Sequence, residues 1–515
     1  MFKILLKRYL ACLLALLIML GLVLYYNHQA KITRVQLAEL SDTRTILEEA
    51  PKYVFLFIGD GMSYPQLQAT SDYLGALEDQ DYLQARPSLG DNQGATLDGP
   101  KYLNFMNFKS TGSAVNFDSN SFAPDSASSA TSISTGNKTY AGSINVDTTG
   151  LVPFETITEK LHEQLGMRVG IISSVNLNHA TPAAFYAHNV SRNNYYDIGL
   201  ELASSGFEFF AGTPFLNPDG HDAANPSENL YEIAEKAGYK ICRTNEEIAS
   251  ISRKDEKVIV VAENMPYEID RMEDTRSLAS YVQKGIEFLD NGNGFFMMCE
   301  GGAIDWACHA NDAATVIHET RALADAVQVA INFARLHPEE TLIIVTGDHE
   351  TGGMSIGFAG TNYDTYLTLL KNQKISFNRF NSLISGYHRN MTPFSEVMRD
   401  IEKYFGLKAY DAPGNLLALT EYELKLLRTA YEKSVLGEKT GMYPQQEYVM
   451  YGSYEPLSVA VTSILNNKAG LSFNTFSHTG LPVAVFAHGK YADDFEGYYD
   501  NTEIFHKLKD IMNVQ

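Results

Sequence analysis

The sequence predicts an α/β fold in which a central, mostly parallel sheet is flanked by helices. Three short apolar runs, at residues 53–58, 295–299 and 342–345, are each closed by glycine within two residues. Unbroken apolar runs of this length are typical of parallel strands that are buried on both faces. Each run is followed within three residues by a carboxylate. The carboxyl ends of the strands should therefore form one acidic edge, where open α/β sheets place their sites.

The first 30 residues predict a signal anchor or a signal peptide. Three basic residues precede an apolar stretch at 9–26, which is longer than the core of a cleaved signal peptide. No small-x-small cleavage pattern follows, which favours an uncleaved anchor with a cytoplasmic N-terminus over a buried core helix. We therefore expect a protein exported to the periplasm or cell envelope and anchored in the inner membrane, with residues 31–50 as a linker.

The composition limits the partners of the chain. The formal net charge is −22, from 62 Asp and Glu against 40 Lys and Arg, and no basic surface for nucleic acid is evident. An acidic protein repels anions at long range, so an anionic substrate needs a local cationic site. Four cysteines without a Cys-x-x-Cys pair do not indicate a disulfide framework.

The carboxylates after the first and third apolar runs predict a metal site. Asp60 follows the first run, and Asp348 and His349 follow the third, while Glu300 directly follows the run between them in sequence. A turn explains one strand that ends in Gly-Asp. Three such endings, one with an adjacent histidine, favour a ligand set of Asp60, Asp348 and His349, closed by Ser126.

A second ligand set is predicted around Asp305. Asp305 and His309 are four residues apart and share one face of a helix, as a structural pair or as half of a zinc site. His478, just before the apolar run 483–486, would complete three ligands with an open position, as catalytic zinc requires. Two metals about 4 Å apart can clamp the attacking and leaving oxygens of a phosphoryl transfer.

Ser126 is the candidate nucleophile. It stands where a loop gives way to a run of small residues that can start a helix, whose free N–H groups and dipole favour negative charge. A serine needs a base or a metal to lose its proton. The segment by itself fits a helix N-cap with a small-residue interface better than a nucleophile, and no Gly-x-Ser-x-Gly elbow surrounds it. The predicted metal sets favour the catalytic interpretation.

These motifs together resemble those of the alkaline phosphatases, in the order in which that family carries them, over about residues 51–515. The matching segments are Ile58 to Met62, Asp125 to Gly136, His179 to Ala183 with Arg192, Glu300 to His309, Asp348 to Gly353, and His478 to Gly480. The resemblance implies hydrolysis of small phosphate monoesters through a phosphoserine on Ser126, with phosphate held by Arg192. The resemblance does not decide whether the protein forms a homodimer.

The resemblance also implies a set of three metals. They are one Zn²⁺ on Asp305, His309 and His478, a second Zn²⁺ on Asp60, Asp348 and His349, and one Mg²⁺ on Glu300, Thr181 and Asp60. Three divalent cations outweigh these carboxylates and would create the local cationic site that an acidic chain needs. The fork of an arginine such as Arg192 matches two phosphate oxygens.

Two positions depart from the best-known bacterial pattern of the family. His179 stands in place of an aspartate near the third metal, and Trp306 stands in place of a lysine. Both replacements occur in other branches. Imidazole suits zinc and cobalt, whereas magnesium prefers oxygen ligands, so the third site could also take Zn²⁺ or Co²⁺.

One catalytic domain is expected over residues 51–515, because no cut between Asp60 and His478 could leave a working site. A large insertion at about 360–475 contains a charged helical stretch and a tyrosine-rich segment. The alternatives are a phosphodiesterase or sulfatase of the same superfamily, or a membrane-tethered metal-binding protein without catalysis. The combination of Glu300, Thr181 and Arg192 favours a monoesterase.

Overall fold

The computed structural model describes residues 50–79, 97–220, 226–252, 254–262, 265–272, 275–411, 414–438 and 441–515. The chain divides into two compact units, Met1–Ala50 and Pro51–Gln515. The predicted signal segment and residues 31–49 of the linker lie outside the described residues. None of the helices in the described part is both long and apolar enough to cross a membrane.

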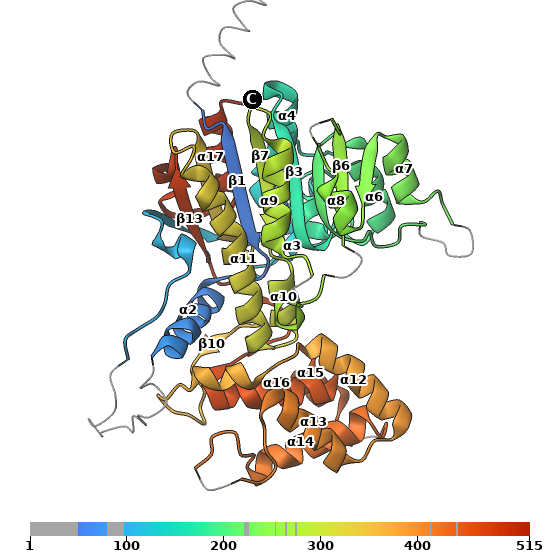
Figure 1. The fold of residues 1–515 in the computed structure, drawn as a ribbon, viewed down its shortest axis with the longest axis vertical. Helices are drawn as coiled ribbons and strands as arrows, with labels where there is room; N and C mark the ends of the chain where they lie inside the picture. The colour runs from blue at the N-terminus through green and yellow to red at the C-terminus, as the bar shows by residue number, and fades with distance from the viewer. Residues whose placement is uncertain are drawn as a thin grey trace, which may run out of the picture. The chain divides into compact units, whose positions relative to one another are not determined.

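A ten-stranded sheet forms the centre of the second unit, in the order β14-β2-β13-β8-β1-β7-β3-β4-β6-β5 (Figure 1). Among its described strand pairs, only β13 runs antiparallel to its neighbours, so the predicted mostly parallel sheet is confirmed. The strands are β1 (Tyr53–Gly59), β2 (Ser110–Val115), β3 (Arg168–Asn176), β4 (Phe209–Thr213), β5 (Tyr239–Cys242), β6 (Lys257–Val261), β7 (Phe295–Glu300), β8 (Thr341–Gly347), β13 (Val483–Gly489) and β14 (Gly497–Asp500).

The three predicted apolar runs form adjacent strands at the middle of this sheet. Every residue of β1, β7 and β8 is buried, which explains why their sequences do not alternate between apolar and polar residues. The register pairs Ile58 with Glu300 and Gly59 with Gly347. The carboxyl ends of the three strands therefore stand level, and the carboxylates that follow them meet at one edge.

Helices cover both faces of the sheet. In Figure 1, α9 and α11 lie in front of it, and α3, α4 and α17 lie behind it and pack against one another. Phe333 of α11 packs against Tyr53 and Phe55 of β1, with ring centroids 4.8 and 5.8 Å away. The helices of this part are α2 (Tyr64–Glu78), α3 (Ser126–Thr135), α4 (Ile157–Leu165), α5 (Ala180–Ala183), α6 (Tyr195–Ser204), α7 (Leu230–Lys236), α8 (Asn245–Ala249), α9 (Leu278–Leu289), α10 (Ala303–His309), α11 (Ala313–Ala334) and α17 (Thr502–Met512).

The region between the last two predicted site motifs is a helical subdomain. Its central helix α16 packs against the other four and also contacts α11 of the main body (Figure 1). The helices are α12 (Phe377–Asn390), α13 (Phe394–Phe405), α14 (Glu421–Ser434), α15 (Pro444–Tyr451) and α16 (Pro456–Ala469). Short strands return the chain to the sheet edge: β9 (Glu350–Thr351) pairs with β12 (His478–Thr479), and β10 (Ser355–Ile356) pairs with β11 (Leu471–Ser472).

Candidate active site

Ser126 is the first residue of α3, as its sequence context predicts. The side chain of Asp125 caps the helix by accepting a hydrogen bond from the backbone N–H of Ser128 at 3.1 Å. This leaves the buried hydroxyl of Ser126 free to face the sheet edge. Its Oγ lies 3.2 Å from His349 Nε2 and 3.5 Å from Asp60 Oδ1. Two residues of the predicted metal set therefore surround the candidate nucleophile.

Asp60, Asp348 and His349 form a compact group, the Asp60 cluster, whose ligand atoms lie within 4.8 Å of one another. His349 Nε2 is 3.2 Å from Asp60 Oδ1 and 3.6 Å from Asp348 Oδ2. The three residues follow the neighbouring strands β1 and β8, so the parallel register brings them together. All three side chains are buried, so each of their polar atoms needs a partner inside the protein.

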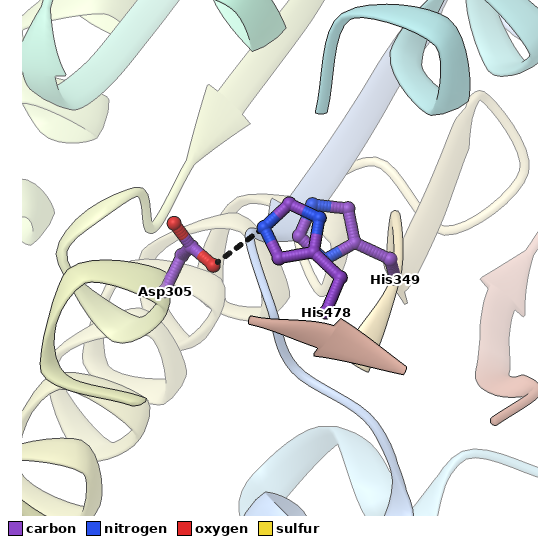
Figure 2. A group of neighbouring side chains, drawn as sticks. All are labelled: Asp305, His349 and His478. Carbon is purple, nitrogen blue, oxygen red and sulfur yellow. Dashed lines mark ion pairs between the residues drawn. The ribbon is translucent and has the colours of Figure 1, made fainter. Parts of the chain in front are cut away.

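Asp305, His309 and His478 form the adjacent Asp305 cluster. His309 Nε2 lies 3.3 Å from Asp305 Oδ2 and 3.1 Å from His478 Nε2. Figure 2 shows the ion pair of 3.6 Å between Asp305 and His478, with the ring of His349 beside that of His478. The two rings stack with centroids 3.7 Å apart. The Asp60 and Asp305 clusters are therefore contiguous.

Backbone carbonyls orient the two histidines of the Asp305 cluster. His309 Nδ1 is 2.6 Å from the carbonyl oxygen of Phe476, and His478 Nδ1 is 2.6 Å from that of Pro124. A carbonyl only accepts, so each Nδ1 carries the proton and donates it. The two Nε2 atoms then face each other at 3.1 Å, and although burial opposes it, the Asp305 carboxylate raises the pKa of His309 to about 9, so the metal-free pair holds one further proton. A shared proton or a cation stabilises such a pair, and this second contact of a ligating histidine is usual at metal sites.

Thr351 connects the two clusters, and sequence reasoning does not identify it. Its Oγ1 donates to Asp305 Oδ1 at 2.5 Å and lies 3.2 Å from His349 Nδ1. The single hydroxyl proton goes to Asp305, so the oxygen accepts the Nδ1 proton of His349. The lone pair of His349 Nε2 then points towards the carboxyl groups of Asp60 and Asp348. The available signal was the position of Thr351 two residues after His349, inside the motif of residues 348–353.

Glu300 and Thr181, the remaining predicted metal ligands, lie beside Asp60. Thr181 Oγ1 donates to Asp60 Oδ2 at 3.4 Å. The hydroxyl of Ser173 donates to Glu300 Oε2, while the buried Oε1 has no hydrogen-bond partner. Burial raises the pKa of Glu300 to about 7. A buried, unpartnered carboxylate oxygen fits the coordination of a cation, because such an atom is otherwise costly.

The site carries more negative charge than the surrounding side chains compensate. Burial, followed by the neighbouring carboxylates, raises the pKa of Asp60 and of Asp348 well above the usual range. Burial acts in the same direction on Asp305, but the charge of His309 and its hydrogen bond outweigh it and lower the pKa of that carboxyl. Inward-facing Nε2 lone pairs together with excess carboxylates form a donor set that fits divalent cations such as zinc.

Arg192 is held by Asp125, the residue that directly precedes Ser126. Its Nη1 is 2.8 Å from Asp125 Oδ2, and its Nη2 is 3.5 Å from His179 Nε2. Burial opposes ionisation of Asp125, but the Arg192 charge and hydrogen bonds lower its pKa to about 2. Burial and Arg192 lower the pKa of His179 to about 3, so this imidazole is neutral. Trp306 packs edge-on against His179 at 5.8 Å.

Comparisons with known proteins agree with this geometry. A family model described as "Alkaline phosphatase" matches residues 51–208 and 207–514. Alkaline phosphatase 3 of Bacillus subtilis is 31% identical over 393 residues, which cover 74% of this chain and 75% of that protein. The crystal structure of a cold-active alkaline phosphatase from a psychrophilic Shewanella species is 29% identical, with a TM-score of 0.68 over 89% of this chain and 99% of that one. Thermus thermophilus alkaline phosphatase, 22% identical, shares the fold with a TM-score of 0.72 over 91% and 94%.

Proposed function

Because the chain belongs to the alkaline phosphatase family, we propose that it hydrolyses phosphate monoesters through a phosphoserine on Ser126. The chain is a phosphomonoesterase with metal sites. The observation that carries the proposal is the position of the Ser126 hydroxyl, 3.2 Å from His349 and 3.5 Å from Asp60 at the start of α3. This hydroxyl stands at the N-terminus of α3, and Asp125 holds the guanidinium of Arg192 close to it.

The chemistry takes place in two displacements. In the first, Ser126 Oγ forms a bond to phosphorus, and the bond from phosphorus to the alcohol oxygen breaks. The alcohol oxygen leaves with the bonding electron pair and is protonated. In the second, water attacks the phosphoserine, phosphate leaves, and Ser126 regains its proton. The fork of Arg192 can hold two phosphate oxygens, and the free N–H groups of α3 favour the transferred negative charge.

The proposed cofactors are two Zn²⁺, one at the Asp305 cluster and one at the Asp60 cluster, and a third cation on Glu300, Thr181 and Asp60. Bound divalent cations supply positive charge and acidify hydroxyl groups and water. The chain contributes the tautomers: Phe476, Pro124 and Thr351 fix the Nδ1 protons of the three histidines. Magnesium is proposed for the third position, and zinc or cobalt are the alternatives that a neighbouring imidazole favours.

The covalent step is tested by acid quenching during turnover. Mass spectrometry should find phosphate on Ser126, and Ser126→Ala should lower kcat for a chromogenic phosphate monoester by at least about 10³-fold. Ser132→Ala is a control in the same helix, because the hydroxyl of Ser132 donates to the backbone carbonyl of Ser128 within α3. A phosphate adduct on another residue, with full activity in Ser126→Ala, would contradict the mechanism. A parallel assay with a phosphate diester separates a monoesterase from a diesterase.

We also propose that the protein is exported and held at the membrane by its N-terminal segment, as the pattern of residues 1–30 predicts. A homodimer remains a prediction. Cell fractionation with N-terminal sequencing tests the anchor: a soluble enzyme that begins after residue 26 would replace the anchor with a cleaved signal peptide. Sedimentation of the purified protein tests the dimer.

A further inference from the structure

A cavity of about 630 Å³ lies between the main body and the helical subdomain. It is lined by residues around the 3₁₀ turn η2 (Glu268–Asp270), by Trp306 of α10, and by the first turn of α12. In Figure 1, α10 lies between the sheet and these helices. Its volume is typical of a site for a small organic molecule. None of the catalytic steps described above uses it.

The cavity adjoins the candidate active site through two of its lining residues. Trp306 follows Asp305 directly and packs on His179. Tyr454 stacks on Phe476 with ring centroids 6.0 Å apart, and the carbonyl of Phe476 orients His309. A group that enters this cavity is therefore one side chain away from the Asp305 cluster.

The position of the cavity next to the Asp305 cluster suits the alcohol part of a substrate. In an in-line displacement the leaving oxygen stands opposite the attacking one. From Ser126, contacts lead to His349, then to His478, whose ring stacks on His349, and then to His309. His309 therefore stands farthest along this series from the nucleophile. Trp306 directly follows Asp305 in α10, and Tyr454 stacks on Phe476, so an alcohol that leaves beside the Asp305 cluster would have the cavity next to it.

We propose that this cavity binds the nucleoside part of a nucleoside monophosphate, which is the leaving alcohol of the reaction. The proposal rests on the proposed function and names a substrate class for it. Four aromatic rings line the cavity, and each retains some exposure. They are Tyr267, Trp306, Phe377 and Tyr454. Partly exposed aromatic faces stack on planar bases, whatever the base.

Polar groups at the same cavity distinguish a nucleoside from a simple aryl alcohol. Within the described part of the chain, the Arg379 side chain is 56% exposed and forms a long ion pair, of 3.9 Å, with Asp270. Glu319 accepts a hydrogen bond from the backbone N–H of Glu268, and burial raises its pKa to about 8. A carboxyl of that kind can donate a hydrogen bond to a base nitrogen near neutral pH. An apolar ring would add no hydrogen bond to these groups, whereas a base and ribose offer both donors and acceptors.

The only tryptophan of the sequence, Trp306, reports occupancy of the cavity directly. Adenosine, which carries no phosphate, should produce a saturable change in tryptophan emission of the purified enzyme, and glycerol should not. Phe377→Ala removes a ring whose centroid lies 5.5 Å from that of Tyr267, and it should weaken adenosine binding roughly fivefold or more. Phe394→Ala is the matched control, because Phe394 is likewise the first residue of a helix, α13, but packs on Tyr431 outside the cavity.

Kinetics supply the second measurement. The wild-type kcat/KM for adenosine 5′-monophosphate should exceed that for glycerol 3-phosphate at least about fivefold, and Phe377→Ala should remove most of this preference while turnover of glycerol 3-phosphate stays within twofold. No saturable change with adenosine, or equal adenosine affinity in wild type and Phe377→Ala, would overturn the proposal. Adenosine binding without turnover of either ester would instead refute the proposed function and leave the binding site standing.

Discussion

Two groups of charged side chains in this protein solve the same electrostatic problem in different ways. At His188, which Glu159 of α4 and Glu201 of α6 flank at 3.5 and 3.6 Å, the carboxylates outweigh the cost of burial and raise the pKa of the imidazole to about 10. At the strand edge, burial and neighbouring carboxylates raise the pKa of Asp60 and of Asp348. The charges of the His188 group are therefore compensated within the chain, by the imidazolium and its two carboxylates.

The difference identifies which of the two groups needs compensating positive charge that the chain itself does not supply. The His188 group pairs a cation with two carboxylates that remain partly accessible, so folding alone stabilises it. The Asp60 cluster places two fully buried carboxylates next to a neutral imidazole, and its nearest compensation would be bound cations. A buried charge without a partner is costly. The arrangement at the strand edge therefore lowers the stability of the metal-free chain and favours the binding of cations.

Removal of metal should produce the largest contrast between the two groups. A chelator should lower kcat for a phosphate monoester by at least about 10³-fold, because charge stabilisation and activation of Ser126 are lost together. Zinc with magnesium should restore the activity. Thermal denaturation should show a lower melting temperature for the chelated protein, since the buried carboxylates then repel one another. Full turnover after complete metal removal would refute the assignment of the clusters.

Neutralising one carboxylate should change the two groups in opposite directions. Asp348→Asn should abolish activity but raise the melting temperature of the metal-free protein by about 2 °C, because it removes a carboxyl whose charged form both burial and the neighbouring carboxylates disfavour. The asparagine Oδ1 can still accept from the backbone N–H groups of Gly61 and His349, as Asp348 Oδ1 does. Glu201→Gln is the matched change at the His188 group and should lower the melting temperature. Destabilisation of the metal-free protein by both variants would remove the contrast.

The pH dependence of stability should distinguish the His188 group further. The folded pKa of His188, about 10, lies above its ordinary value of 6.5, so its contribution is complete below pH 6.5 and is lost as the pH rises towards 10. Chemical denaturation of the wild type and of His188→Gln should therefore show a stability difference that is constant at pH 5–6 and smaller at pH 9–10. A difference that increases with pH would show that the imidazole is not held protonated.

The smallest expected effect concerns the third metal position. His179→Asp combined with Trp306→Lys should strengthen magnesium activation and lower the phosphate inhibition constant several-fold, because an oxygen ligand and a cation are introduced. His179 Nε2 lies 3.5 Å from Arg192, and its buried Nδ1 has no partner, so the side chain could also act by hydrogen bonding alone. Metal analysis of the double variant decides: unchanged metal content and unchanged inhibition would mean that both departures are silent.

The sequence by itself determined those features that depend on local pattern. The unbroken apolar runs that became β1, β7 and β8 report burial on both faces, and Asp125 before a run of small residues marks the start of α3. The family resemblance rests on short motifs of the same local kind, and the family is shown by the comparisons. The roles of individual metal ligands, Ser126 and Arg192 remain predictions.

The tertiary structure alone decided the contacts between distant segments. Pro124 lies 354 residues from His478, whose Nδ1 proton its carbonyl accepts, and Phe476 lies 167 residues from His309. No local pattern encodes such pairs, because strand register and the return of the chain from the helical subdomain create them. The same holds for Thr351 between the clusters, for the antiparallel β13, and for the cavity beside Trp306. Their positions depend on how whole elements pack, which residue spacing does not contain.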